Sequence, residues 1–193
     1  MSDNNDNKKT EIPEGLYAQS ANAQPKIKMP DVKAETGQGA GLTVSHMLGE
    51  ITWLLSQSPT HKHFALSDLE WMVMPALMLE QYRIFRSGNQ PLGLALWAYL
   101  SDEAEAKLQS GAGRLRPDEW AVNMKIDPED GVTSEAGGKL WLVDLIAPFH
   151  TTENKLADQM LADLIQGPFK GKTFKFHQTD PQTGERKVME LGE

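Results

Sequence analysis

An aspartate stands in the middle of an apolar run, LWLVDLIAPF, at residues 140–149. In a regular strand, Asp144 would share one face with the apolar side chains of Leu142 and Ile146. Moving an ionised carboxylate out of water without a partner costs several kcal/mol. The pattern therefore predicts that Asp144 has a polar partner elsewhere in the chain.

Histidine is the partner that would give this carboxylate a chemical use. A carboxylate that accepts from one ring nitrogen fixes the tautomer and makes the other nitrogen a better base. His61 stands out because it lies in SPTHKHF, a loop between two predicted helices, where a base can be held and still be reached. Spacing alone does not join His61 to Asp144. A structural role for the aspartate and a surface role for the histidine therefore stay open.

Other chemistries have weaker support in the sequence. His61 and His63 form an H-x-H pair, but two imidazoles without a clear third ligand do not predict a metal site. Ser58 lacks the G-x-S-x-G context of a hydrolase nucleophile. The chain has no cysteine, which excludes disulfides, thiolate zinc sites and a cysteine nucleophile.

Composition narrows the class of protein further. The 193 residues include 27 acidic and 19 basic side chains, interspersed, with a net charge of -8, which argues against nucleic-acid binding. No apolar stretch approaches the ~20 residues that cross a bilayer, so stable membrane insertion is not expected. The start of the chain has no apolar core of a secretory signal. Together with the absence of cysteine, this favours a cytoplasmic protein.

The elements that would position these residues begin after a polar tail. Residues 1–42 are rich in Asn, Gln, Lys, Gly and Pro and show no periodicity, so we expect a disordered tail followed by one domain at 43–193. Helices before, between and after strands predict a mixed α/β or α+β domain. The helices are expected at 44–55, at 65–81 with a Ser67-x-x-Glu70 capping box and a break at Pro75, at 101–109 capped by Ser101, and at 152–166. The strands are expected as a hairpin at 81–100, weakly at 120–126, and at 139–147, 172–178 and 186–191.

Three blocks of the sequence carry a resemblance to a known family. They are ITWLLSQSPTHKHF, QYRIFRSGNQPLGLALWAYLSDEAE and KLWLVDLIAPF, in this order. In order and interval they resemble the RTX-toxin-activating lysine acyltransferases, over about residues 44–150. In that family the histidine of the S-P-x-H block and the aspartate of the D-x-I-A-P-F block are the catalytic pair. The resemblance implies that His61 and Asp144 are catalytic here.

The same resemblance implies a fold and a reaction. The fold is similar to that of the GCN5-related N-acetyltransferases (GNAT), a central, mostly antiparallel sheet flanked by helices. The family takes a fatty acyl group from acyl carrier protein, with no tightly bound cofactor, and transfers it to internal lysines of an RTX protoxin. The sequence leaves open whether the protein forms a homodimer, and it identifies no cofactor-binding residue.

Two features bear on the acyl donor. The segment APFHTTENKLADQ lacks the R-x-x-G-x-G/A loop with which ordinary GNAT enzymes bind the pyrophosphate of coenzyme A. A helix N-terminus near Thr151–Thr152 would suit the single phosphate of a carrier protein's arm. Because carrier proteins are acidic, we also expect a basic patch drawn from Arg83, Arg86, Arg114, Arg116, Lys170 and Lys172.

Two other functions stay open at this stage. One is a coenzyme A-dependent N-acyltransferase that acts on another amine. The other is a non-catalytic accessory or binding partner of an RTX-like protein. An aspartate kept in an apolar strand disfavours the second alternative, because a degenerate site has no use for it.

Overall fold

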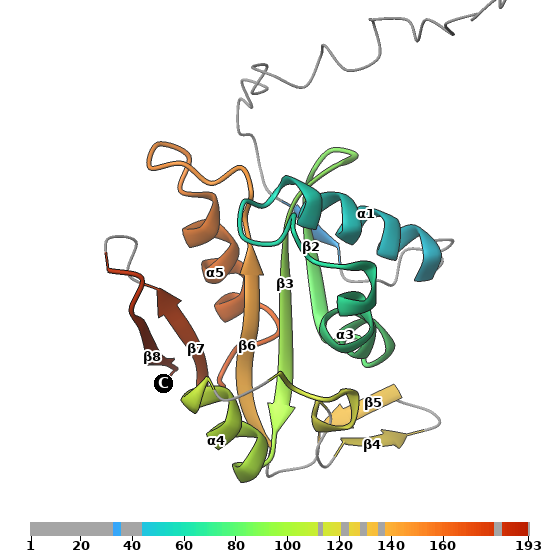
Figure 1. Ribbon diagram of the computed structural model, residues 1–193, viewed down its shortest axis with the longest axis vertical. Coiled ribbons are helices and arrows are strands. Elements are labelled where there is room, and N and C mark those ends of the chain that lie inside the picture. Colours follow the sequence, from blue (N-terminus) through green and yellow to red (C-terminus); the bar gives the residue numbers. More distant parts are fainter. Residues whose placement is uncertain are drawn as a thin grey trace, which may run out of the picture.

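A six-stranded sheet forms the centre of the computed structural model (Figure 1). The structure describes residues 33–35, 44–111, 114–120, 124–127, 131–134, 138–179 and 183–192. Spatially, the sheet runs β1 (Lys33–Glu35), β2 (Tyr82–Ser87), β3 (Gln90–Leu100), β6 (Lys139–Ile146), β7 (Phe174–Thr179) and β8 (Arg186–Leu191). A separate two-stranded sheet pairs β4 (Met124–Asp127) with β5 (Gly131–Ser134).

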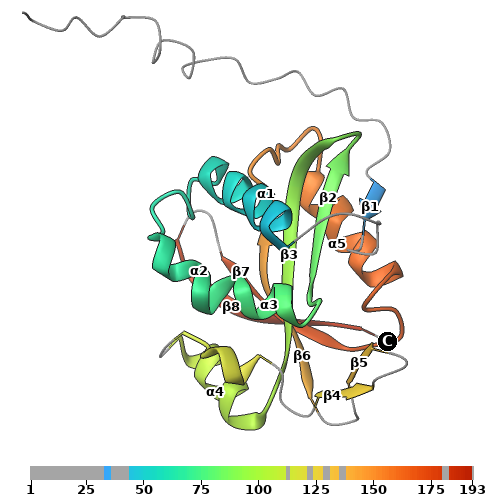
Figure 2. The ribbon, with the colours of Figure 1, turned by 90° about the vertical axis from the view of Figure 1, so that its right-hand side faces the viewer.

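Helices cover both faces of the central sheet. Helices α1 (Val44–Gln57), α2 (Leu69–Met72) and α3 (Met74–Met78) lie on one face, and α5 (Leu156–Gln166) lies on the other (Figures 1 and 2). Helix α4 (Asp102–Ser110) follows β3 directly, and short 3-10 turns occupy Leu66–Asp68 and Pro117–Glu119. The layers explain why β3 is apolar on both sides, as expected for a strand with helices on each face.

Each face of the sheet has its own core. Leu94 and Leu96 of β3 pack with the buried side chains of α1 to α3, whereas Ala95 and Trp97 pack with α5. Helix α5 approaches the sheet closely at Gly93. A Cβ atom at that position would lie 2.5 Å from the Met160 sulfur, so the absence of a side chain permits the contact.

The mixed α/β class is confirmed, and so is a mostly antiparallel sheet. The exception is the parallel pairing of β6 with β7, which joins only Leu140–Leu142 to Phe174–Phe176. Beyond this point β6 and β7 do not pair with each other, although β6 continues to pair with β3 and β7 with β8. A single parallel pair that stops early is consistent with the expected GNAT-like arrangement. The predicted tail lies outside the described residues, except that Lys33–Glu35 pair with β2 as an edge strand.

Most elements were predicted correctly from local signals, but β5 was not predicted and two helices differ from their predicted form. Between residues 65 and 81, the helix is interrupted at Val73, and Pro75 lies in the first turn of α3, where its missing N–H removes no helical hydrogen bond. The cap is formed by Asp68, which accepts from the Ala65 N–H, and not by the predicted Ser67–Glu70 box. Ser101 caps α4 as predicted, by accepting from the Ala104 N–H.

The second difference concerns the start of α5, which was predicted near Thr151–Thr152. The helix begins at Leu156, because Thr151 and Asn154 form a closed turn of side-chain and backbone hydrogen bonds ahead of it. The Leu156 N–H donates to Asn154, and the Ala157 N–H donates to His150. These first-turn donors are therefore already used within the protein, which weakens the predicted phosphate site.

Candidate active site

His61 lies in a tight turn that follows α1. The Ser58 N–H donates to Leu55 at the end of the helix, and the N–H groups of His61 and Lys62 both donate to the Ser58 carbonyl. Phe64 N–H in turn donates to the His61 carbonyl. Four backbone hydrogen bonds thus fix the position of the imidazole, although it lies outside any helix or strand. Its side chain is only 12% exposed.

Asp144 reaches the same face of the sheet through a β-bulge. In the pairing of β3 with β6, Leu96 lies opposite Asp144 and Trp97 lies opposite Leu142, so that Val143 is an extra residue. The alternation of faces is shifted at this point. Leu142 packs on the α5 side, whereas Asp144 lies opposite Leu96 on the side of α1. The expectation that Leu142 and Asp144 share a face is therefore wrong, because it assumed a regular strand.

The two side chains meet. His61 Nε2 lies 2.9 Å from Asp144 Oδ2, across 83 positions of sequence. The Asp144 side chain is 28% exposed, so the carboxylate lies at the edge of the protein and is not sealed within it. The partner expected for the aspartate is thus present, and it is the histidine singled out from the sequence. The contact itself assigns no role to either residue.

The opposite side of the ring holds a contact that the sequence reasoning missed. The Ser58 hydroxyl lies 2.7 Å from His61 Nδ1, and the Thr60 hydroxyl lies 3.0 Å from the same atom. These two hydroxyls are also 3.0 Å apart. Ser58 is only 5% exposed. The S-P-T-H spacing is the signal that could have found this contact, because a turn brings residues i and i+3 together.

These contacts define the protonation of a neutral imidazole. An ionised carboxylate is only an acceptor, so the Nε2 atom must carry the proton that it donates to Asp144. The Nδ1 lone pair then accepts from the Ser58 or Thr60 hydroxyl. The site is a chain of hydroxyl, imidazole and carboxylate. Such a chain can take up a proton at Nδ1 and stabilise the resulting imidazolium through Asp144.

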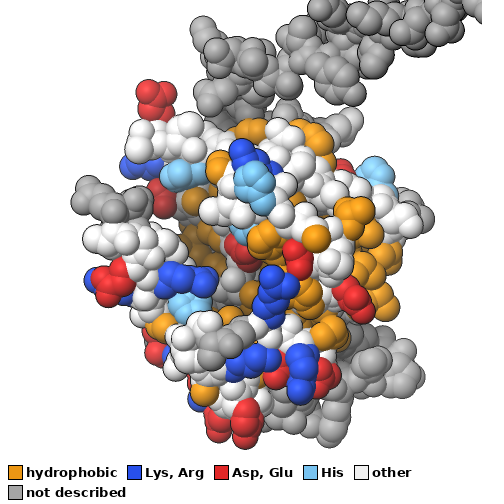
Figure 3. Space-filling model, viewed as in Figure 1, with side chains coloured by type: hydrophobic (Ala, Val, Ile, Leu, Met, Phe, Trp, Pro, Cys, Tyr) orange, Lys and Arg blue, Asp and Glu red, His pale blue; other side chains and the backbone are white. Residues whose placement is uncertain are grey.

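A hollow in the surface adjoins this chain. Beyond Leu142, β6 has no strand neighbour on the β7 side among the described residues, although it continues through Asp144 to Ile146. The space-filling view shows the surface hollowed over this gap, with hydrophobic side chains in its floor (Figure 3). The hollow gives an apolar ligand a route to the edge of β6.

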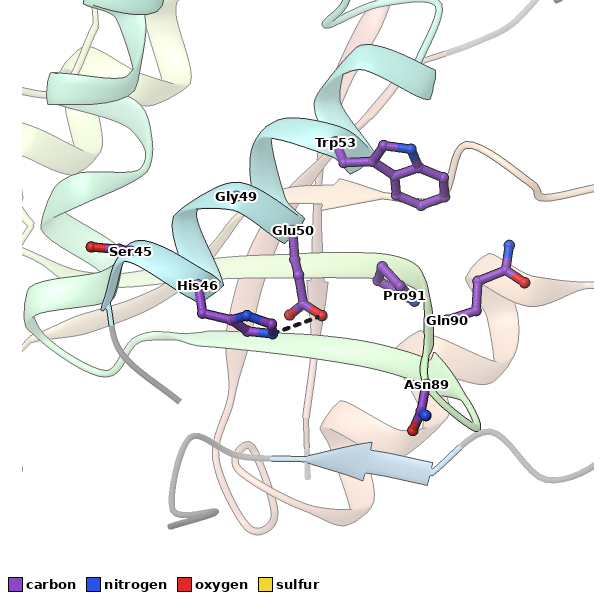
Figure 4. A pocket seen from close by; sticks show the side chains of 8 residues that line it. All are labelled: Ser45, His46, Gly49, Glu50, Trp53, Asn89, Gln90 and Pro91. Atoms are coloured by element: carbon purple, nitrogen blue, oxygen red, sulfur yellow. Dashed lines mark ion pairs between the residues drawn. The ribbon is translucent and has the colours of Figure 1, made fainter. Parts of the chain in front are cut away.

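A separate groove of about 630 Å³ lies between α1 and the turn that joins β2 to β3. Trp53 and Pro91 line it together with the ion-paired His46 and Glu50, which lie 3.5 Å apart (Figure 4). Neither His61 nor Asp144 lines this groove. It connects to the site only indirectly, because the ring of Trp53 packs 5.8 Å from that of Phe149, which follows β6.

The predicted basic patch is mostly neutralised in the structure. Each arginine proposed for it has an acidic partner, in the pairs Arg83–Asp163, Arg86–Glu50, Arg114–Asp68 and Arg116–Asp118. Lys172 instead donates to the Tyr99 hydroxyl, 3.0 Å away. These side chains therefore do not form one cationic surface.

The described residues offer neither a metal centre nor a membrane span. No three His, Cys, Asp or Glu side chains in the described part of the chain are placed to hold a metal ion. None of the helices that the structure describes is long and apolar enough to cross a membrane. Cofactor-binding residues also stay unassigned.

Comparison with known proteins identifies a family. The sequence profile of the RTX toxin acyltransferase family matches residues 40–191. An RTX-II toxin-activating lysine-acyltransferase of Actinobacillus pleuropneumoniae is 32% identical over 104 residues, which cover 54% of this chain and 56% of the relative. A leukotoxin-activating lysine-acyltransferase of Aggregatibacter actinomycetemcomitans is 33% identical over 140 residues, covering 68% and 75% of the two chains. A protein-lysine myristoyltransferase of Escherichia coli is 27% identical over 145 residues, covering 75% and 74%.

The extent of these matches differs between relatives. The chain spans little more than half the length of the Actinobacillus pleuropneumoniae relative, and about three quarters of the other two. Both His61 and Asp144 lie within the region matched by the family profile.

Proposed function

Because the chain belongs to the RTX toxin acyltransferase family, we propose that it is a protein-lysine acyltransferase that activates an RTX protoxin. The single observation that carries this proposal is the 2.9 Å contact between His61 and Asp144, within a chain that ends at a hydroxyl. The names of the relatives support lysine as the acceptor, since each is described as a lysine acyltransferase or myristoyltransferase.

His61 would act as the general base. A lysine amine has a reference pKa of about 10.4 and is protonated near neutral pH, so it must lose a proton to become a nucleophile. Nδ1 can accept that proton through the hydroxyl of Ser58 or of Thr60, which lie 2.7 Å and 3.0 Å away. Asp144 would hold the ring in the required tautomer and stabilise the imidazolium.

The neutral amine nitrogen would attack the thioester carbonyl carbon and form the new C–N bond. Collapse of the tetrahedral intermediate breaks the C–S bond, and the imidazolium returns its proton to the leaving thiolate. The second ammonium proton, which stays on the attacking nitrogen after the attack, is released to solvent. The products are an amide on the lysine, the free thiol of the donor and one proton in water, with His61 neutral again.

Direct transfer is favoured over an acyl-histidine intermediate. Nucleophilic catalysis by imidazole needs a ring nitrogen whose lone pair faces the substrate. Here Nε2 is engaged by Asp144, and Nδ1 is engaged by two hydroxyls, one of them on the buried Ser58. A proton can pass along such hydrogen bonds, whereas an acyl group cannot.

The β6 edge would bind the other reactant. Between Val143 and Ile146, its backbone groups on the β7 side have no strand partner among the described residues. A backbone N–H at this edge can stabilise the oxyanion of the tetrahedral intermediate, a role worth about 3 kcal/mol per donor. The apolar floor of the adjacent hollow would suit a fatty chain (Figure 3).

We propose acyl carrier protein as the donor. The segment after β6 lacks the pyrophosphate loop of coenzyme A-dependent enzymes, and the first N–H groups of α5 are capped by Asn154 and His150. A carrier protein's arm has one phosphate and no pyrophosphate, so it needs no such loop. Its acidic surface would have to find isolated cations here, because the predicted arginine patch is paired internally.

The test is a reconstituted reaction. The purified protein is incubated with an RTX protein and either acyl-acyl carrier protein or acyl-coenzyme A, and acylated lysines are mapped by mass spectrometry. We expect acyl-lysine with the carrier-protein donor, none with His61→Ala, and no stable acyl adduct on the enzyme when the acceptor is omitted.

Each alternative gives a different result in this assay. Turnover only with acyl-coenzyme A would replace the proposed donor. Binding of the RTX protein without acylation by the wild-type enzyme would instead favour a non-catalytic accessory. An acyl group found on His61 would overturn direct transfer.

A further inference from the structure

The loop that follows His61 exposes apolar side chains beside the reactive ring. Phe64 is 39% exposed and Leu66 is 79% exposed. The Phe64 ring meets that of His61 edge to face, with centroids 5.2 Å apart and planes at 78°. An exposed aromatic ring in contact with the proposed base is placed where it can contact a substrate side chain.

The ring belongs to an ordered surface. Trp71 lies 6.4 Å from Phe64, centroid to centroid, and the Arg114 guanidinium lies 4.5 Å above the Trp71 ring. Asp68 holds both partners, because it accepts from Trp71 Nε1 at 3.1 Å and from Arg114 Nη1 at 3.0 Å. We call Phe64, Trp71 and Arg114 the aromatic ledge. Its fixed geometry means that little side-chain freedom is lost on binding.

The chemistry of the ledge fits a lysine side chain. A lysine has four methylenes that pack on apolar surface while the amine reaches beyond them. Desolvation and nearby positive charge both lower the pKa of an amine and so favour the neutral nucleophile. Phe64 supplies the desolvation, and the exposed Lys62 and Arg114 supply positive charge nearby, partly offset by Asp68.

The other approach to the site is suited to the second reactant. The hollow over the gap between β6 and β7 is apolar and adjoins the unpaired edge of β6. The acyl donor and the acceptor must approach His61 from different directions for the amine to meet the thioester. The hollow fits the acyl chain, which leaves the ledge for the acceptor.

We propose that the aromatic ledge is the docking surface for the acceptor polypeptide, with Phe64 seating the methylene stem of the lysine that is acylated. The proposal rests on the proposed lysine acyltransferase activity and adds a substrate-binding residue to it. The partner is a polypeptide segment that presents a lysine beside apolar residues, which would pack on Trp71 and the exposed Leu66.

The test compares three variants. Phe64→Ser removes the ring, Phe64→Tyr keeps it, and Val188→Ser on the outermost strand β8 is a control of matched exposure, at 41%. We expect Phe64→Ser to raise the acceptor KM about fivefold to tenfold, because the lysine stem would no longer bury its apolar surface against the ring. Phe64→Tyr and Val188→Ser should stay within about twofold of the wild type, since surface changes elsewhere are small.

Two further measurements distinguish whether Phe64 binds the acceptor or only holds the His61 ring in position. Hydrolysis of the acyl donor without acceptor, and the donor KM, should be unchanged in Phe64→Ser. An unchanged acceptor KM would overturn the proposal. A raised donor KM would assign the ledge to the carrier protein, and an equal loss of acceptor-free hydrolysis would show that Phe64 only positions His61.

Failure of the underlying function has its own signature. If the wild-type enzyme acylates no lysine, the proposed activity fails, whatever the ledge does. Acceptor binding is then measured by calorimetry in the His61→Ala background, with and without Phe64→Ser. Equal affinities for the acceptor would remove the ledge as well, and weaker binding in Phe64→Ser would retain it as a docking surface.

Discussion

Two carboxylates of this protein, Glu105 and Asp144, differ in how many hydrogen bonds they accept. Glu105 of α4 has a side chain that is 6% exposed and accepts from the Lys139 and Lys175 amines and from the Trp141 indole. Asp144 of β6 has a side chain that is 28% exposed and a single hydrogen-bond partner among the described residues, His61. Both carboxylates belong to elements next to β3, yet only Asp144 combines exposure to solvent with a single hydrogen-bond donor.

This difference separates a structural carboxylate from a reactive one. A buried carboxylate with three donors is out of reach of a substrate, and its role is to join α4 to β6 and β7. A half-buried carboxylate with one partner stabilises the protonated form of that partner through its negative charge. Burial and charge therefore do not by themselves mark a carboxylate as part of an active site. A carboxylate whose single hydrogen-bond partner can change its protonation state is the better candidate.

The largest effect expected is that of Asp144→Asn. An asparagine amide can donate to Nε2, which would move the ring proton to Nδ1 and remove the base. General acid–base catalysis contributes about 10²- to 10⁴-fold, so kcat for lysine acylation should fall by that order. Measured by donor-dependent acylation, the loss should come with a melting temperature near that of the wild type. If Asp144→Asn lowered the free energy of unfolding as much as Glu105→Gln does, the two carboxylates would not differ in role.

The matched change is Glu105→Gln, for which we expect a loss of stability with little loss of activity. Removing the charge leaves Lys139 and Lys175 facing a neutral amide, and hydrogen bonds to charged groups are worth about 2 kcal/mol each. The free energy of unfolding in urea should drop by about that amount, while kcat of the folded enzyme stays within about twofold. Loss of activity without loss of stability would show that Glu105 serves the site.

Ser58→Ala tests the far end of the chain of hydrogen bonds. The variant loses the hydroxyl 2.7 Å from Nδ1 and keeps that of Thr60 at 3.0 Å, so we expect kcat to fall about tenfold. Ser56→Ala is the control, because the Ser56 hydroxyl bonds only within α1 and its neighbour Gln57. Inactivation as complete as that of His61→Ala would instead show that Ser58 is indispensable to the chain and that Thr60 cannot replace it.

The smallest effect concerns acid stability. Burial acts to raise the pKa of Glu105, but the hydrogen bonds from Lys139, Lys175 and Trp141 outweigh it and hold the pKa below its ordinary value of 4.5. The unfolded state then binds the proton first, so this contribution is present above pH 4.5 and is lost as the pH falls through the lowered pKa. Thermal melts between about pH 5 and pH 3 should show a shallower decline for Glu105→Gln than for the wild type. Parallel curves would mean that Glu105 titrates normally.

Local signals in the sequence predicted the elements well. The apolar spacing around Ile51 placed α1, the turn at Gly88 placed the β2–β3 hairpin, and Ser101 was correctly identified as a cap. Each of these depends on residues within a few positions of one another. The break at Val73 was displaced, because a proline is tolerated in a first turn and the sequence does not show where that turn begins.

The site was predicted in part, and the remainder depended on distant contacts. The pairing of His61 with Asp144 came from a family resemblance, since nothing in their spacing joins them. The contact of Ser58 with Nδ1 depends on the ring orientation that Asp144 sets from the other side. The acidic partners of Arg83 and Arg86 lie on helices far away in sequence, and for that reason free cations were predicted where ion pairs exist.

The bulge at Val143 makes the site depend on how the strand is paired as well as on the identity of its residues. In a regular strand that kept Val143, Asp144 would share the face of Leu142 and point toward α5, away from the imidazole. A sequence change that straightened the strand without changing its length would therefore leave the D-x-I-A-P-F motif intact and separate its carboxylate from His61. Recognition of an intact member of the family requires the bulge before the motif to be considered together with the motif.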